Sequence, residues 1–235
     1  MSKSIGFANA ERVIAGACGS GDYARKAKYL LSIAPVSPAE FFRRWLFAYV
    51  SVHVDPLEAI RSYEELRDLG WLNNPAKLRE VLHNGCENRV LAFAAAFWRE
   101  PKQFYGKRGQ SWTDYRDWLR EHIPGLGLAW TSLVVEMVWP TQAKVVYLDG
   151  NLLQLYGRSG TCDLPTATYC ELERHWVTTC RQYQLAPPVV GAMYRGTLTI
   201  QQNSVNWTGI FEKRREGLLV KLAKILRNGN HKGES

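Results

Sequence analysis

The amino-acid sequence predicts a mainly α-helical fold, and three observations support this prediction. Apolar residues recur with helical spacing over most of the chain. Helix-start signals such as Ser37-Pro38 occur, because Ser caps a helix and Pro is tolerated at its first position. Strand signals, which would be short runs of alternating apolar and polar residues, are sparse.

The same signals place the individual helices. We expect helices over residues 1–35, 38–50, 56–68, 75–85, 87–99, 111–121, 128–137, 152–156, 165–184 and 187–194. The helix over 38–50 is apolar nearly all round, which is typical of a core helix. Polar loops are expected over 103–110 and 196–206. We divide the chain into a helical domain, 1–212, and a basic C-terminal helix and tail, 213–235.

Charge indicates the kind of partner. The chain has 235 residues, a formal net charge of +8 and a pI of about 9.3. A basic balance favours polyanions, so nucleic acid is the first candidate partner and an anionic membrane surface the second. From Lys213 onward the chain carries seven Lys or Arg and two Glu, which we expect to add nonspecific DNA affinity. No apolar run of membrane-spanning length and no cleavable signal pattern is present, so we expect a soluble, cytoplasmic protein.

The cysteines and histidines form no metal-binding pattern. The five cysteines are an odd number without a Cys-x-x-Cys pair, and the five histidines lack ligand spacing. We therefore expect reduced thiols, no disulfide framework and no metal site. The nine tryptophans suit both a packed core and stacking surfaces, and composition does not separate these uses.

The sharpest motif joins the helices over 111–121 and 128–137 and reads Ile123-Pro124-Gly125-Leu126-Gly127. Two glycines one residue apart allow backbone angles that are closed to other residues. The first amides of the second helix lack partners within the helix, and the helix dipole adds positive charge there, which suits a phosphate. A tight turn between two helices would need glycine as well, so a purely structural role stays open.

A second motif follows where the apolar stretch 145–148 ends in Asp149-Gly150-Asn151. An aspartate at a helix start is first of all a good N-cap. Asp149 lies 22 residues after Gly127 (149 − 127), which is enough for one helix and a return loop. We therefore expect Asp149 to return towards the hairpin, either as a cap alone or as a reactive carboxylate.

Together these motifs resemble the helix-hairpin-helix DNA glycosylase superfamily over about residues 111–157. The Asp-Gly-Asn version of the second motif is especially similar to the adenine glycosylase branch. The resemblance implies a helical fold with two lobes around a DNA cleft, and Asp149 as the catalytic carboxylate. It also implies that a DNA phosphate, with a monovalent cation as a bridge, is held at Pro124, Gly125, Leu126, Gly127 and Ala129.

The sequence departs from two branches of that superfamily. Members that also cleave the strand carry a Schiff-base lysine after the hairpin, whereas the matching positions here are Leu128, Ala129 and Trp130. Iron–sulfur branches carry four closely spaced cysteines, whereas Cys162, Cys170 and Cys180 are widely spaced and no fourth follows. We expect neither lysine-based strand cleavage nor a cluster, and no cofactor beyond the hairpin cation.

A second resemblance covers more of the chain. A phage branch of the superfamily, which acts in thymidine hypermodification, is similar at Gly125-Leu126-Gly127-Leu128-Ala129, at 152–157, at Met193-Tyr194 and at Trp207. Its members are described as glutamyl/putrescinyl thymine pyrophosphorylases or amino acid:DNA transferases. This resemblance implies a phage-encoded protein that works after a separate DNA-base kinase has converted 5-hydroxymethyluracil into a pyrophosphate ester. A free amino acid or polyamine then attacks and expels pyrophosphate.

Both kinds of chemistry need the base to be reached, usually by extrusion from the duplex. Candidates for holding the base or filling the gap are Trp98, Trp112, Trp130, Tyr105, Tyr147 and Asn151, although core packing can explain each aromatic residue. The cations that could stabilise the leaving pyrophosphate, or equally contact phosphates of the DNA backbone, are Lys102, Lys107, Arg108 and Arg195.

Three functions stay open at this point. The first is a transferase that places an amino acid or amine on activated 5-hydroxymethyluracil in DNA. The second is a monofunctional DNA N-glycosylase, and the third is a DNA-binding protein without catalysis. The target base, the amine, the strandedness of the DNA and the oligomeric state are not determined by the sequence.

Overall fold

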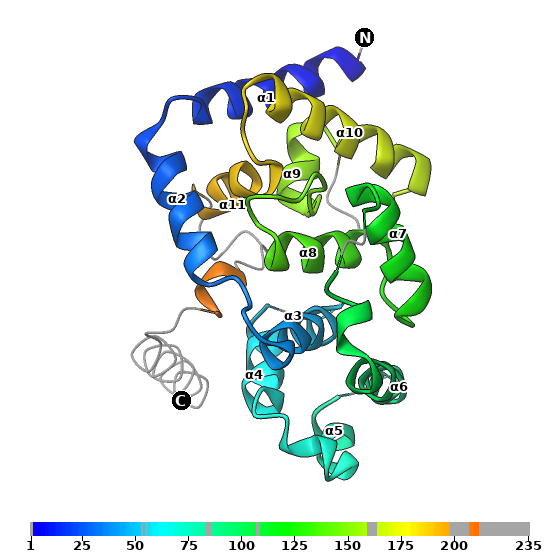
Figure 1. Cartoon of the computed structure of the whole chain (residues 1–235). Coiled ribbons are helices and arrows are strands. Elements are labelled where there is room, and N and C mark those ends of the chain that lie inside the picture. Colours follow the sequence, from blue (N-terminus) through cyan, green and yellow to red (C-terminus); the bar gives the residue numbers. More distant parts are fainter. Residues whose placement is uncertain are drawn as a thin grey trace, which may run out of the picture.

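The structure is a computed structural model, and it describes residues 2–52, 54, 56–82, 86–106, 109–158, 164–197 and 207–211. Within these residues it contains eleven α-helices, three short 3-10 helices and no strand (Figure 1). The predicted mainly α class is confirmed.

The N-terminal half supplies six of the helices. They are α1 (Ser2–Ala17), α2 (Gly21–Ser32), α3 (Pro38–Ser51), α4 (Pro56–Leu66), α5 (Pro75–Val81) and α6 (Cys86–Arg99). The short helices η1 (Gly70–Leu72) and η2 (Pro101–Gln103) lie in the connections.

The C-terminal half supplies the remaining helices. They are α7 (Trp112–His122), α8 (Leu128–Val138), α9 (Gly150–Leu155), α10 (Thr166–Gln182) and α11 (Pro187–Thr197), followed by η4 (Trp207–Gly209). The η4 segment lies against α2, because the hydroxyl of Tyr29 donates a hydrogen bond to the Thr208 carbonyl at 2.8 Å.

Helix ends follow the capping signals of the sequence. Ser37 accepts a hydrogen bond from the Glu40 amide at 3.2 Å, and Ser111 accepts one from the Asp114 amide at 3.0 Å. The expected helix over 1–35 is instead two helices, because Gly19 has a φ of +70° and Ser20 caps α2. Helix α11 continues to Thr197, which is beyond its predicted end at 194.

The core consists of two hydrophobic clusters that lie on either side of α8. The larger cluster joins α3, α6, α7 and α8, and the smaller joins α1, α9, α10 and α11. Figure 1 shows α1 and α10 side by side at one end of the molecule and α4, α5 and α6 at the other, with α8 between. Nine of the eleven residues of α8 are buried, so it is the central element of the fold.

The predicted division of the chain is not tested, because the boundary between the domain over 1–212 and the tail over 213–235 falls outside the described residues. Among the helices that are described, none combines the length and the apolar character needed to cross a bilayer.

Candidate functional site

The hairpin between α7 and α8 has the backbone geometry that its glycines predict. Gly125 has a φ of +85°, which is the left-handed region where glycine is favoured. Ile123 and Leu126 are buried, whereas Pro124, Gly125 and Gly127 are exposed. The turn is therefore anchored by two apolar side chains and presents its backbone to solvent.

The start of α8 carries unpaired amides. Gly127 is the N-cap and has no side chain to accept a hydrogen bond. The first backbone hydrogen bond of the helix is donated by the Thr131 amide to the Gly127 carbonyl at 3.0 Å. The amides of Leu128, Ala129 and Trp130 precede this bond, and the helix dipole makes this end positive.

Two residues that sequence reasoning missed support the hairpin. The hydroxyl of Tyr49, on α3, donates a hydrogen bond to the Pro124 carbonyl at 2.7 Å. The side chain of Arg89, on α6, lies so close to Gly125 that an added Cβ would be 3.0 Å from its Nη1 and closer still to its Cδ. Arg89 is exposed, so its charge lies beside the hairpin. No local signal in the sequence could reveal these contacts, because they join distant helices.

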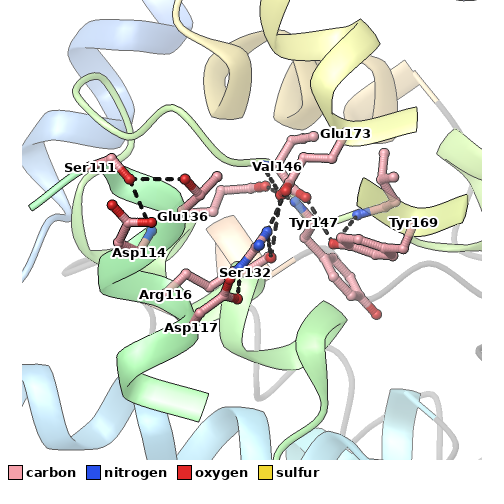
Figure 2. A network of polar contacts seen from close by, with 12 residues as sticks. Ser111, Asp114, Arg116, Asp117, Ser132, Glu136, Val146, Tyr147, Tyr169 and Glu173 are labelled. Atoms are coloured by element: carbon pink, nitrogen blue, oxygen red, sulfur yellow. Dashed lines mark hydrogen bonds and ion pairs between the residues drawn. The ribbon is translucent and has the colours of Figure 1, made fainter. Parts of the chain in front are cut away.

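The extended segment 145–148 connects α8 to Asp149, and its backbone is held by side chains instead of by a neighbouring strand (Figure 2). Glu173 accepts a hydrogen bond from the Val146 amide at 3.2 Å, and Glu136 accepts one from the Tyr147 amide at 3.0 Å. The hydroxyl of Tyr169 donates to the Val146 carbonyl at 3.0 Å. Helices α8 and α10 therefore fix the path of the chain just before Asp149.

Arg116, on α7, completes one part of this network. Its guanidinium forms an ion pair with the buried carboxylate of Glu173 and also contacts Asp117 at 3.1 Å (Figure 2). Burial by itself would lower the pKa of Arg116, but Glu173 outweighs it and the pKa is raised. The guanidinium is therefore a permanent charge that ties α7 to α10.

Arg195, on α11, completes the part of this network around Glu136 and Tyr147. Its side chain is 2% exposed, forms an ion pair with Glu136, and donates from Nη1 to the Tyr147 carbonyl at 3.0 Å. Burial raises the pKa of Glu136, and Arg195 opposes this shift. From the sequence, Arg195 was a candidate cation for a leaving pyrophosphate or a DNA phosphate. The structure instead uses its donors inside the protein, because only tertiary packing brings Glu136 to it.

Asp149 lies at the end of this network, where one carboxylate oxygen has an ion-pair contact with Arg195 and no hydrogen bond. Its Oδ1 accepts a hydrogen bond from the Leu152 amide at 2.9 Å, so the predicted N-cap of α9 is confirmed. Its Oδ2 is buried, has no hydrogen-bond partner, and is 4.0 Å from Nε of Arg195. A buried carboxylate oxygen without a donor is rare in native proteins and is a reason to consider a functional role.

Several predicted site residues are brought together near Asp149. The rings of Trp130 and Tyr147 are 5.6 Å apart, and both side chains are less than a tenth exposed. Asn151 is buried in the first turn of α9, two residues after Asp149 in sequence. The first turn of α8, which carries Trp130, is therefore packed against Tyr147, two residues before Asp149 in the chain.

Other predicted residues lie elsewhere or are not described. Tyr105 packs against Phe41 and lines a separate cavity of about 290 Å³. Lys102 is exposed on η2. Lys107 and Arg108 fall outside the described residues. The described residues contain no group of three or more His, Cys, Asp or Glu that could hold a metal ion.

A cavity of about 560 Å³ lies between α1, α2 and α11, close to the Asp149 network. Tyr194 lines it, and burial together with the charge of Asp149 raises the pKa of its phenol. Lys26 also lines it, and burial together with the charge of Arg195 lowers the pKa of its ammonium. Asp149 does not line this cavity, and its charge reaches the cavity through the electrostatic effect on Tyr194.

Comparison with known proteins supports the fold. No family model and no curated protein sequence matches the chain. Among solved structures, the chain is similar to the 8-oxoguanine glycosylase/lyase of Methanocaldococcus jannaschii in complex with a 15mer DNA containing 8-oxoguanine. The TM-score is 0.59 at 18% identity, over 77% of this chain and 91% of the other. The predicted helix-hairpin-helix glycosylase-like fold is thereby shown, and nothing in these comparisons supports the phage hypermodification branch.

Proposed function

We propose that this protein binds DNA through the hairpin over 123–127 and acts on an extruded base with the carboxylate of Asp149. The observation that carries the proposal is the buried Oδ2 of Asp149, which has no hydrogen-bond partner. It sits on a rigid network that leads back to the helix following the hairpin. Such an arrangement fits a carboxylate that stabilises developing positive charge on a substrate.

Three observations support DNA as the partner. The chain has a net charge of +8, and the first amides of α8, which have no partner within the helix, follow the exposed residues of the hairpin. Arg89 adds a cation beside that turn. The structural neighbour was determined in complex with DNA.

The reaction that this geometry supports best is hydrolysis of a base–sugar bond. Asp149 would stabilise positive charge on the sugar as the bond to the base breaks, and the electron pair would leave with the base. Water then bonds to C1′ of the sugar, and its proton passes by way of Asp149 to the departing base. Because Leu128, Ala129 and Trp130 supply no amine after the hairpin, the strand stays intact.

A second candidate reaction is transfer of an amino acid or amine to activated 5-hydroxymethyluracil. The cavity between α1, α2 and α11 favours it, because a second small substrate needs space that hydrolysis does not, and Tyr194, which lines this cavity, interacts electrostatically with Asp149. In this reaction Asp149 accepts a proton from the amine, the nitrogen bonds to the base methylene carbon, and pyrophosphate leaves.

One experiment separates the candidates. The protein is incubated with DNA that carries modified or mismatched bases, including 8-oxoguanine, 5-hydroxymethyluracil and its pyrophosphorylated form, with pooled amino acids and polyamines. Release of free base with an alkali-labile site supports the glycosylase. A new amino-substituted nucleoside in an intact strand supports the transferase.

The variant Asp149→Asn tests the residue. Asn is also a good N-cap, so we expect the melting temperature and DNA affinity to be little changed, while the rate falls by about 100-fold or more. Full activity in this variant would remove Asp149 from the mechanism. Unchanged DNA in every arm of the experiment would favour a binding protein without catalysis.

A further inference from the structure

A second charged cavity, which we call the arginine cavity, lies beside the N-terminal half of α3. It has a volume of about 380 Å³ and is lined by side chains of α3, α4 and the C-terminal segment. Its polar lining consists of Arg43, Arg44, Arg67, Tyr63, Glu40 and Asp68. It shares none of these residues with the site around Asp149.

Arg44 is the buried centre of this cavity. Its side chain is only 4% exposed, and its guanidinium lies 3.4 Å from the centre of the Phe211 ring. Nη2 donates a hydrogen bond to the Ile33 carbonyl, but Nε is buried without any partner. Among the described residues, no carboxylate oxygen lies within the 4.0 Å of an ion pair with Arg44.

The two carboxylates of the cavity make their short contacts elsewhere. Glu40 accepts a hydrogen bond from the Val36 amide at 2.8 Å. Asp68 accepts one from the Gly70 amide at 2.9 Å and lies 3.6 Å from the ammonium of Lys77. Neither described carboxylate forms an ion pair with Arg44, and the charge of Glu40 acts on it only from a longer distance.

Arg43 and Arg67 add charge at the rim of the cavity. Nε of Arg43 donates to the Arg67 carbonyl at 2.8 Å, which links α3 to the end of α4. Arg67 is half exposed and pairs with Glu64 at 3.0 Å. One buried and two more accessible guanidinium groups thus face a common space.

A buried charge without a counter-ion is unfavourable for the fold. Burial lowers the pKa of Arg44 to about 10, so the side chain is still a cation at neutral pH. An unpaired buried charge costs several kcal/mol unless a partner compensates it. An anion that enters the cavity would supply this partner.

We propose that the arginine cavity binds a phosphoryl anion through Arg44, Arg43 and Arg67. Guanidinium groups present planar pairs of donors that match phosphate oxygens, and Nε of Arg44 is a donor that has no other use. The anion is a free phosphate or pyrophosphate, or the phosphate of a nucleotide or of DNA.

The position of Arg44 on α3 favours the free anion. Arg44 lies five residues before Tyr49, which contacts the hairpin. At about 100° per residue these two side chains leave the helix about 140° apart. The arginine cavity and the hairpin therefore lie on different sides of α3.

The test measures thermal unfolding of the full chain at constant ionic strength, with chloride replaced stepwise by phosphate or by pyrophosphate. We expect a saturable increase in melting temperature, as ligand binding to the folded state requires. Arg44→Met and Arg43→Gln should weaken the apparent affinity by about tenfold or more, because each removes charge-assisted hydrogen bonds. Arg61→Gln removes the same charge from an exposed position of α4 outside the cavity and should leave the affinity unchanged.

The measured quantity is the increase in melting temperature that the anion causes in each variant. A variant that melts at a different temperature without the anion can therefore still be compared. If Arg44→Met fails to fold, Arg43→Gln still decides the question. Absence of saturation in the unsubstituted protein, or equal affinities in the cavity variants and Arg61→Gln, would overturn the proposal.

Measuring DNA binding by the Arg43→Gln variant identifies the source of the anion. Weaker DNA binding in parallel with weaker pyrophosphate binding assigns the site to DNA phosphate, and unchanged DNA binding assigns it to a free anion.

Discussion

Gly125 shows how a single residue shapes the hairpin. Its φ of +85° is strained for any residue with a Cβ, and the side chain of Arg89 occupies the space that a Cβ would need. The neighbouring Gly127 differs in both respects, since its φ is −72° and no atom lies within 4 Å of an added Cβ. The two glycines of the motif therefore have different physical roles.

We expect Gly125→Ala to lower the free energy of unfolding by about 1–3 kcal/mol, because the backbone is strained and Arg89 must move. Gly127→Ala is the matched control and should cost at most about 1 kcal/mol, as a poorer N-cap. Urea unfolding measures both. Equal losses in the two variants would contradict the distinction between the two positions.

Arg89 is a single charge whose effect on DNA binding can be isolated. We expect Arg89→Gln to weaken DNA binding and to reduce the slope of log K against log salt by about one unit. Fluorescence anisotropy at several salt concentrations measures the slope. Arg79→Gln, an exposed arginine of α5, is the control, and an equal effect there would show that only net charge matters.

At the scale of elements, the unit that matters is the connection from α8 through 145–148 to α9. The segment has no strand beside it, so its amides and carbonyls depend on buried side chains from α8, α10 and α11. Because buried backbone groups need partners, these ion pairs determine where Asp149 lies. The helices themselves need only their local caps and apolar faces.

The two carboxylate partners of Arg116 make this dependence measurable. Glu173→Gln removes the buried one of the two counter-ions of Arg116, and we expect a loss of about 3–5 kcal/mol in the free energy of unfolding. Asp117→Asn removes the half-exposed partner and should cost less than about 1 kcal/mol. Denaturant midpoints of both variants provide the comparison, and similar losses would contradict the central role of Glu173.

At the scale of the whole molecule, charge and fold act together. The two hydrophobic clusters on either side of α8 hold the hairpin and Asp149 on one scaffold. The net charge of +8 favours association with polyanions, and the sequence from Lys213 onward carries a local excess of five positive charges. Long-range attraction and local positioning are therefore supplied by different parts of the chain.

Deletion of residues 213–235 tests this division. We expect weaker DNA binding and a salt slope reduced by about 1–5 units, because up to seven cations are removed. The rate of reaction on bound DNA should not change, since Asp149 and its network are intact. A slope equal to that of the full chain would show that the tail does not contact DNA.

The sequence by itself determined the helical class, the caps at Ser37, Ser111 and Asp149, and the hairpin between α7 and α8, because each depends on neighbours within a few residues. Only the tertiary structure decided the partners of buried charges. The sequence offered Arg195 as a candidate for binding a phosphoryl group, whereas the fold pairs it with the buried Glu136, and Arg44 gave no signal within its apolar helix. The physical reason is that ion pairing and desolvation depend on which distant side chains share a buried space, and chain-local patterns carry no information about that.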